Sequence, residues 1–216
     1  MTVASPVESG VLDGRVLPAA ELRCSPLQDR RAEFAERRVE GPRGVRLCEE
    51  PFLTQVDLRL SPDGPAADRV ERALGLALPR ESADPATGDD QRSALWLGPD
   101  EWLVVAPDGS AHQVLVAARE ALADTPGSVV DVSSNRTTLR LSGPMAREVL
   151  EKVCSLDLHP RSFGPGRCAQ TLVGRAQVVL WQVATEPAYR LMVRCSFAHY
   201  LADLLLDAMG EFTGRP

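Results

Sequence analysis

LRLS at residues 58–61, followed by GPAA at 64–67, returns almost unchanged as LRLS at 139–142, followed by GPMA at 143–146. Each Gly-Pro pair is followed by an amphipathic stretch. Internal self-similarity indicates a repeated structural unit, and two copies are too few for a solenoid. The sequence therefore predicts a duplicated supersecondary unit that closes into one globule. In such a scaffold we expect the functional groups where the two halves meet.

Hydrophobic periodicity predicts a β-α-β-β-α-β order in the first copy. Residues 52–60 alternate apolar and polar side chains, as a half-buried strand does. Pro65 suits the first turn of a helix, and the apolar residues that follow it have a helical period. The remaining strand, strand, helix and strand are predicted at residues 94–97, 101–106, 110–123 and 129–132.

The second copy repeats much of this order. Its predicted strand, helix, hairpin, strand and helix lie at residues 137–141, 144–153, 168–183, 188–194 and 196–208. Ser196 is expected to cap the last helix. We expect an α+β fold of duplicated split β-α-β units, with helices packed on a mostly antiparallel sheet. The units cover residues 45–136 and 137–216 and are parts of one domain.

Residues 1–44 form an N-terminal arm with little periodic apolar content. It contains one short predicted helix at 26–38. Such an arm is either disordered or laid over another surface. In the second case Phe34, its main aromatic residue, is a candidate contact to a partner. Deleting residues 1–42 would then weaken assembly more than folding.

The overall composition excludes several classes of protein. The formal net charge is −6, and no basic block of the kind that neutralises phosphates is present, which argues against nucleic acid as a partner. We find no signal peptide and no apolar run of the length that spans a membrane. The five cysteines form no C-x-x-C pair, so a reduced, cytoplasmic setting is expected.

Groups that carry common chemistries are scarce. The three histidines, His112, His159 and His199, have no second ligand at metal spacing. No dinucleotide fingerprint, P-loop or nucleophile elbow is present. Cys168 follows Arg167, which would favour a thiolate, but a packing role is the stronger interpretation. We therefore predict no catalytic, cofactor-binding or metal-binding residue on this chain.

DVSSNR at residues 131–136 is the most polar stretch between predicted strands, and it joins the two copies. Asp131, Ser133 and Arg136 are candidates for a vestigial ligand site or an interface. The alternative is a turn whose side chains bond to its own backbone.

A series of motifs, in this order, resembles the γ subunit family of heterotetrameric sarcosine oxidase. They are LGPDEWL (97–103), DVSSNR (131–136), LSGPMAR (141–147), CSLDL (154–158) and RCSFA (194–198). The resemblance runs from about residue 45 to the end of the chain. One departure is Asn135, which stands where many relatives are expected to have the histidine of Asp-x-Ser-His-Arg. It argues against proton chemistry at this turn.

The resemblance implies a fold similar to the folate-binding domain of aminomethyltransferase, the glycine-cleavage T-protein. It also implies an enzyme complex that oxidises sarcosine to glycine and reduces O2 to hydrogen peroxide. Tetrahydrofolate accepts the one-carbon unit as methylene-tetrahydrofolate. The FAD, FMN, NAD, zinc and folate sites are attributed to other subunits. The implied partners are the α, β and δ subunits, mainly α.

Three hypotheses follow for the function. The first is a structural subunit of this oxidoreductase complex. The second is an independent folate-binding or one-carbon-transfer protein, which the fold similarity and the 131–136 junction suggest. The third is a stand-alone enzyme that uses Cys168, and it ranks far below the others.

Overall fold

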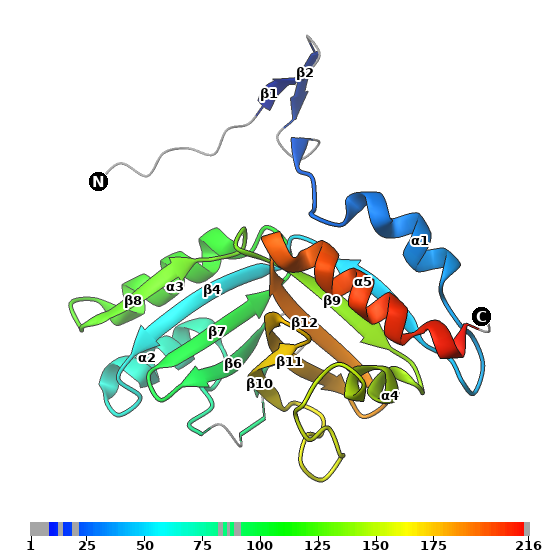
Figure 1. Cartoon of the computed structure of the whole chain (residues 1–216). Helices are drawn as coiled ribbons and strands as arrows, with labels where there is room; N and C mark the ends of the chain where they lie inside the picture. Colours follow the sequence, from blue (N-terminus) through cyan, green and yellow to red (C-terminus); the bar gives the residue numbers. More distant parts are fainter. Residues whose placement is uncertain are drawn as a thin grey trace.

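Two five-stranded antiparallel sheets face each other, and helices cover the outer face of each (Figure 1). The computed structural model describes residues 9–12, 15–18, 22–81, 84–85, 87–88 and 92–213. The predicted combination of helices with antiparallel sheet is confirmed. The two sheets share an apolar core between them, and each has a second core under its helices.

The first sheet consists, in spatial order, of β5 (Thr87–Gly88), β6 (Ser93–Gly98), β7 (Glu101–Ala106), β4 (Thr54–Leu60) and β8 (Gly127–Asp131). Helices α2 (Pro65–Leu74) and α3 (Ala111–Leu122) pack on its outer face. As predicted, Pro65 stands in the first turn of α2. The two-residue strand β5 lies outside the segments that the sequence predicts as strand or helix.

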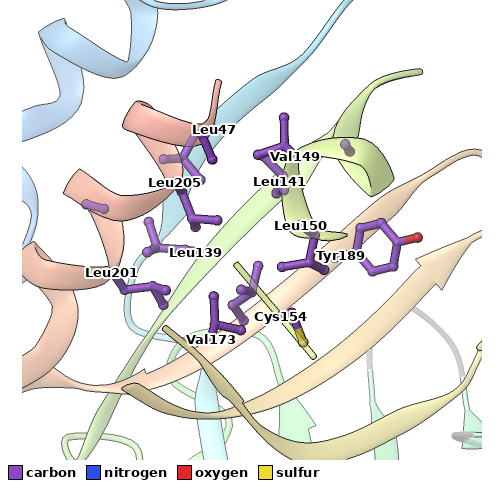
Figure 2. Packing of buried hydrophobic residues seen from close by; sticks show 14 of the residues in the cluster. Leu47, Leu139, Leu141, Val149, Leu150, Cys154, Val173, Tyr189, Leu201 and Leu205 are labelled. Carbon is purple, nitrogen blue, oxygen red and sulfur yellow. The ribbon is translucent and has the colours of Figure 1, made fainter. Parts of the chain in front are cut away.

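The second sheet consists, in spatial order, of β10 (Cys168–Val173), β11 (Ala176–Ala184), β12 (Ala188–Arg194), β9 (Arg136–Ser142) and β3 (Arg46–Glu50). Helices α1 (Arg31–Glu36), α4 (Ala146–Glu151) and α5 (Ala198–Ala208) contribute to the core on its outer face. Figure 2 shows Leu139 and Leu141 of β9 between Leu201 and Leu205 of α5 and Leu150 of α4.

Strand β3 joins the second sheet, although it precedes β4 and lies within the range assigned to the first unit. It pairs with β9 from Arg46↔Ser142 to Glu50↔Thr138. The edges of the neighbouring strands explain this placement. Both edges of β4 are taken, by β7 and β8, whereas β9 has β12 on one edge and, without β3, would leave its other edge open. An open edge next to a buried strand presents unpaired backbone groups, and β3 satisfies them.

The described part of the N-terminal arm after residue 21 belongs to the folded body. Leu27 and Phe34 are buried in the core of the second sheet, with 0% and 3% of their surface exposed. The interpretation of Phe34 as a partner contact is therefore wrong. Residues 1–42 also include these core residues, so deleting them would damage folding as well as assembly. Strands β1 (Ser9–Leu12) and β2 (Arg15–Pro18) form a hairpin that projects from the body (Figure 1).

Two helices begin without a side-chain cap, and at one of them, α5, the sequence predicts such a cap. Helix α5 begins at Ala198, with Phe197 in the capping position and Ser196 in a short 3-10 turn, so Ser196 does not cap it. Ser110 does precede α3, but its side chain makes no capping hydrogen bond. The packing of each helix on its sheet provides the stabilisation that the missing caps would add.

Candidate functional site

The turn between β8 and β9 borders a hollow of about 650 Å³. All three predicted side chains, Asp131, Ser133 and Arg136, line this hollow. Its other walls include Arg23 and Pro26 of the arm, the bend before β4 and the residues at the start of α3. The structure thus brings the predicted residues together at the connection between the two sheets.

Ser133 is bound within the turn itself. Its hydroxyl donates to Asp131 Oδ1 over 2.5 Å and accepts a hydrogen bond of 2.9 Å from the backbone N–H of Gln55. The backbone N–H of Ser133 also donates to Asp131 Oδ1, over 2.9 Å. Side chains that bond to a nearby backbone in this way stabilise turns. Asp131 and Ser133 therefore hold the connection between the sheets and attach it to β4.

Arg136 differs from these two residues. Its side chain is half-buried, and we find no hydrogen-bond acceptor or ion-pair partner for its guanidinium among the described residues. Its cross-strand neighbour in the β9–β12 pair is Arg194. Burial lowers the pKa of Arg136, and the positive charge of Arg194 lowers it further. Asp57 and Glu101 act on this charge from a distance and raise the pKa, but among the described residues no carboxylate contacts the guanidinium.

Arg23 attaches the N-terminal arm to the folded body at one side of the hollow. Its guanidinium forms an ion pair with Asp108, at 2.8 Å, and lies over the ring of Phe52, at 4.1 Å from the centroid. Each contact is worth little at an exposed site. The pattern of the sequence does not reveal these contacts, because 85 residues separate Arg23 from Asp108.

Cys168 lies in a setting that disfavours a reactive thiol. It is 7% exposed, and its Sγ donates to the backbone carbonyl of Trp96. Burial raises the pKa of this thiol, and the opposing effect of Arg167 is smaller. A thiol that stays protonated is a poor nucleophile. The geometry therefore supports the packing role.

The histidines and cysteines do not form a metal site in the described residues. His112, His159 and His199 are exposed, and all five cysteines are free. Within the ranges that the structure describes, no three side chains of His, Cys, Asp or Glu gather into a possible metal site.

A membrane-crossing helix needs about 20 predominantly apolar residues. Among the described helices, none combines that length with that character.

Comparison with known proteins identifies the family. Residues 61–211 match the model of the sarcosine oxidase, gamma subunit family. The sarcosine oxidase subunit gamma of Corynebacterium sp. (strain U-96) is 37% identical over 198 residues, which cover 92% of this chain and 95% of the relative. That of an Arthrobacter species is 38% identical over 197 residues, with 91% and 95% covered.

Solved structures agree with this assignment. A chain of the heterotetrameric sarcosine oxidase from Corynebacterium sp. U-96, solved in complex with pyrrole 2-carboxylate, superposes with a TM-score of 0.84 at 38% identity. The match covers 90% of this chain and 98% of that chain. Aminomethyltransferase T of the glycine cleavage system from Bartonella henselae gives a TM-score of 0.55 at 15% identity, with 92% and 53% covered, so it shares the fold alone. The chain belongs to the sarcosine oxidase γ-subunit family.

Proposed function

We propose that this chain is a non-catalytic assembly subunit of a heterotetrameric sarcosine oxidase. The complex would oxidise sarcosine to glycine, reduce O2 to hydrogen peroxide and pass the one-carbon unit to tetrahydrofolate. One observation carries this proposal: the chain matches 98% of a chain in a solved heterotetrameric sarcosine oxidase, with a TM-score of 0.84.

The geometry of the hollow supports a structural role. Asp131 and Ser133 bond to each other and to the backbone of β4. Cys168 is buried, with a raised pKa. General acid–base and nucleophilic catalysis need a group that titrates or attacks near neutral pH and can reach a substrate. Neither Ser133 nor Cys168 meets that requirement.

The cofactors and partners of the complex are part of the same proposal. We assign FAD, FMN, NAD, zinc and the folate site to the other subunits, as the family resemblance implies. Among the α, β and δ subunits, we propose α as the main partner. A cytoplasmic location is consistent with the five free cysteines.

We further infer that the two halves arose by duplication of a split β-α-β unit. The order β4-α2-β6-β7-α3 in the first half corresponds to β9-α4-β11-β12-α5 in the second. The repeated LRLS segments end β4 and β9. Strands β8 and β3 occupy the same edge position, next to β4 and β9. This correspondence supports a division after residue 136, with β3 (Arg46–Glu50) as the edge strand of the second half although it precedes β4.

The alternative function is an independent folate-binding or one-carbon-transfer protein. Its support is the fold shared with aminomethyltransferase T and the hollow beside Asp131. Likeness of fold does not transfer a function without the site. Titration of the purified chain with tetrahydrofolate separates the two proposals, because the assembly role predicts no affinity below the millimolar range.

Co-expression with the other subunits tests the main proposal. We expect an affinity-tagged copy of this chain to co-purify with the α, β and δ chains. We expect the tagged chain alone to show no sarcosine oxidation. The proposal would be contradicted if the chain is a stable monomer that does not bind these subunits. Oxidation of sarcosine by the chain alone would also contradict it.

A shorter truncation tests the arm. Removal of residues 1–21 deletes the projecting β1–β2 hairpin but keeps Leu27 and Phe34 in the core. We expect incorporation into the complex to fall at least about 10-fold, because the hairpin offers contact area outside the body. The melting temperature should stay within about 2 °C. A Gly-Ser segment of equal length is the control for the loss of chain, and normal incorporation of either variant would remove the hairpin from the interface.

A further inference from the structure

Four side chains form a row across the second sheet, on the face that elsewhere packs against the first sheet. Leu172 of β10 pairs with Gln177 of β11, and Arg194 of β12 pairs with Arg136 of β9. Gln177 and Arg194 are one step beyond the Val178↔Val193 pair, so the row is continuous. The row lines a shallow groove of about 330 Å³ together with Gln170, Thr171, Val178 and Val179. No acidic side chain is among the residues that line it.

A second arginine pair on the same two strands shows what such a pair normally requires. Arg140 of β9 faces Arg190 of β12, four residues along each strand from Arg136 and Arg194. Glu50 at the end of β3 binds both guanidiniums. Its carboxylate accepts from Arg140 Nη1 at 3.0 Å and from Arg190 Nε at 2.6 Å. This chain therefore neutralises one of its two cross-strand arginine pairs with an internal carboxylate.

The other pair lacks such a carboxylate because β3 is too short to supply it. Glu50 lies opposite Thr138, and the chain then turns away through Phe52, whose φ is 61°. Like charges directly opposite each other in a sheet are destabilising. The lowered pKa of Arg136 reflects its burial and the charge of Arg194. Asp57 and Glu101 raise this pKa, but neither forms an ion pair with it. An external anion would relieve the repulsion.

The surroundings of the groove favour a protein as the source of that anion. Leu172, at one end of the row, is an apolar side chain that is 50% exposed, so the groove joins an apolar side chain to two arginines. Arginine is enriched in the energetic centres of protein interfaces. A small inorganic anion would leave the apolar side chain of Leu172 exposed to solvent.

We propose that Arg136, Arg194, Gln177 and Leu172 form a docking surface, here called the arginine face. Its occupant is an acidic segment of another subunit of the complex, with a carboxylate placed between the two guanidiniums. Guanidinium–carboxylate pairs form strong, directional hydrogen bonds, and charge complementarity selects the acidic partner. This inference rests on the proposed assembly role.

Competitive incorporation tests the arginine face in the complex itself. Wild-type chain and the Arg194→Glu variant are co-expressed with the other subunits, and their ratio in the purified complex is measured by mass spectrometry. We expect at least about 30-fold less variant, because the new carboxylate repels the acidic segment. Arg72→Glu is the matched control. Arg72 is an exposed arginine on α2, and its Nε–H donates to the backbone carbonyl of Asp68 in the same helix. Equal incorporation of Arg194→Glu and Arg72→Glu would overturn the proposal.

Zero-length cross-linking tests the contact without altering the charge. In the assembled complex, an Arg194→Lys variant treated with a carbodiimide should link Lys to an Asp or Glu of another subunit. Arg72→Lys should give no such link. A link only to carboxylates of this chain, such as Asp57 or Glu101, would contradict the proposal. This cross-linking experiment remains informative if Arg194→Glu impairs folding.

The outcomes separate this inference from the proposed function. If wild-type chain fails to enter the complex, the assembly role itself fails. If wild-type and Arg194→Glu chains enter equally, only the arginine face fails. Inorganic phosphate probes the remaining source of anion. The proposal would be overturned if assembly is unaffected while phosphate raises the melting temperature of the wild-type complex and not that of the Arg136→Gln/Arg194→Gln complex.

Discussion

Trp102→Ala is expected to lower the free energy of unfolding by about 4 kcal/mol. Trp102 on β7 is fully buried under α2 and α3, and it is one of the largest side chains in that core. Its Nε1–H also donates to the backbone carbonyl of Pro79 over 2.7 Å. The substitution therefore opens a cavity and leaves a buried acceptor unpaired, and both effects destabilise the fold. Equilibrium unfolding in urea measures the change.

Two controls separate these contributions. Trp102→Phe keeps most of the ring volume but loses the N–H, so we expect a loss of about 1–2 kcal/mol. Val116→Ala on α3 removes an exposed side chain and should change the free energy of unfolding by no more than about 0.5 kcal/mol. If Trp102→Ala behaves like Val116→Ala, the core of the first sheet is not packed as described here.

Glu50→Gln is expected to cost about 2–3 kcal/mol. The substitution removes the only charge that the described structure places between Arg140 and Arg190, which are 33% and 15% exposed at their side chains. Breaking a buried ion pair by removing one partner costs about 3–5 kcal/mol, and partial exposure reduces that figure. The loss also weakens the attachment of β3, because Glu50 is its last residue. Chemical denaturation again gives the measurement.

The matched control is Glu120→Gln on the exposed face of α3, where we expect a change near zero. A triple variant with Glu50→Leu, Arg140→Met and Arg190→Met should recover most of the lost stability, because apolar groups often replace a buried ion cluster at little cost. If the triple variant is as unstable as Glu50→Gln, the loss comes from packing of β3 and not from the uncompensated arginines.

The regular elements of this chain could be predicted because they depend on local patterns. Pro65 does stand in the first turn of α2, and the hairpin predicted at residues 168–183 forms, with its turn at Gly174, whose φ is 57°. Alternating residues in β4 and a helical period in α3 reflect which faces are buried, and they are visible in short windows of sequence. The placement of Asp131, Ser133 and Arg136 at the connection between the sheets also followed from the repeat.

The predictions were wrong where distant contacts decide. Nothing in the residues around Phe34 shows that its ring enters the core of the second sheet, which β3 forms together with strands and helices more than 100 residues later. Cap prediction at Ser196 was wrong because a 3-10 turn precedes α5 and shifts its start. The packing role predicted for Cys168 agrees with the structure, because burial raises the pKa of its thiol by more than Arg167 lowers it.

By itself, the sequence determined the order of strands and helices, the internal repeat and the family to which the motifs belong, because these are written in neighbouring residues. Only the tertiary structure decided that β3 completes the second sheet, since pairing depends on which strand edge is left open after the others have paired. It also decided which of two similar cross-strand arginine pairs binds an internal carboxylate. Glu50 binds Arg140 and Arg190, whereas the chain turns away before it reaches the pair of Arg136 and Arg194. The electrostatic energy of a charge depends on the groups within a few ångströms of it in space, and the sequence does not show which groups these are.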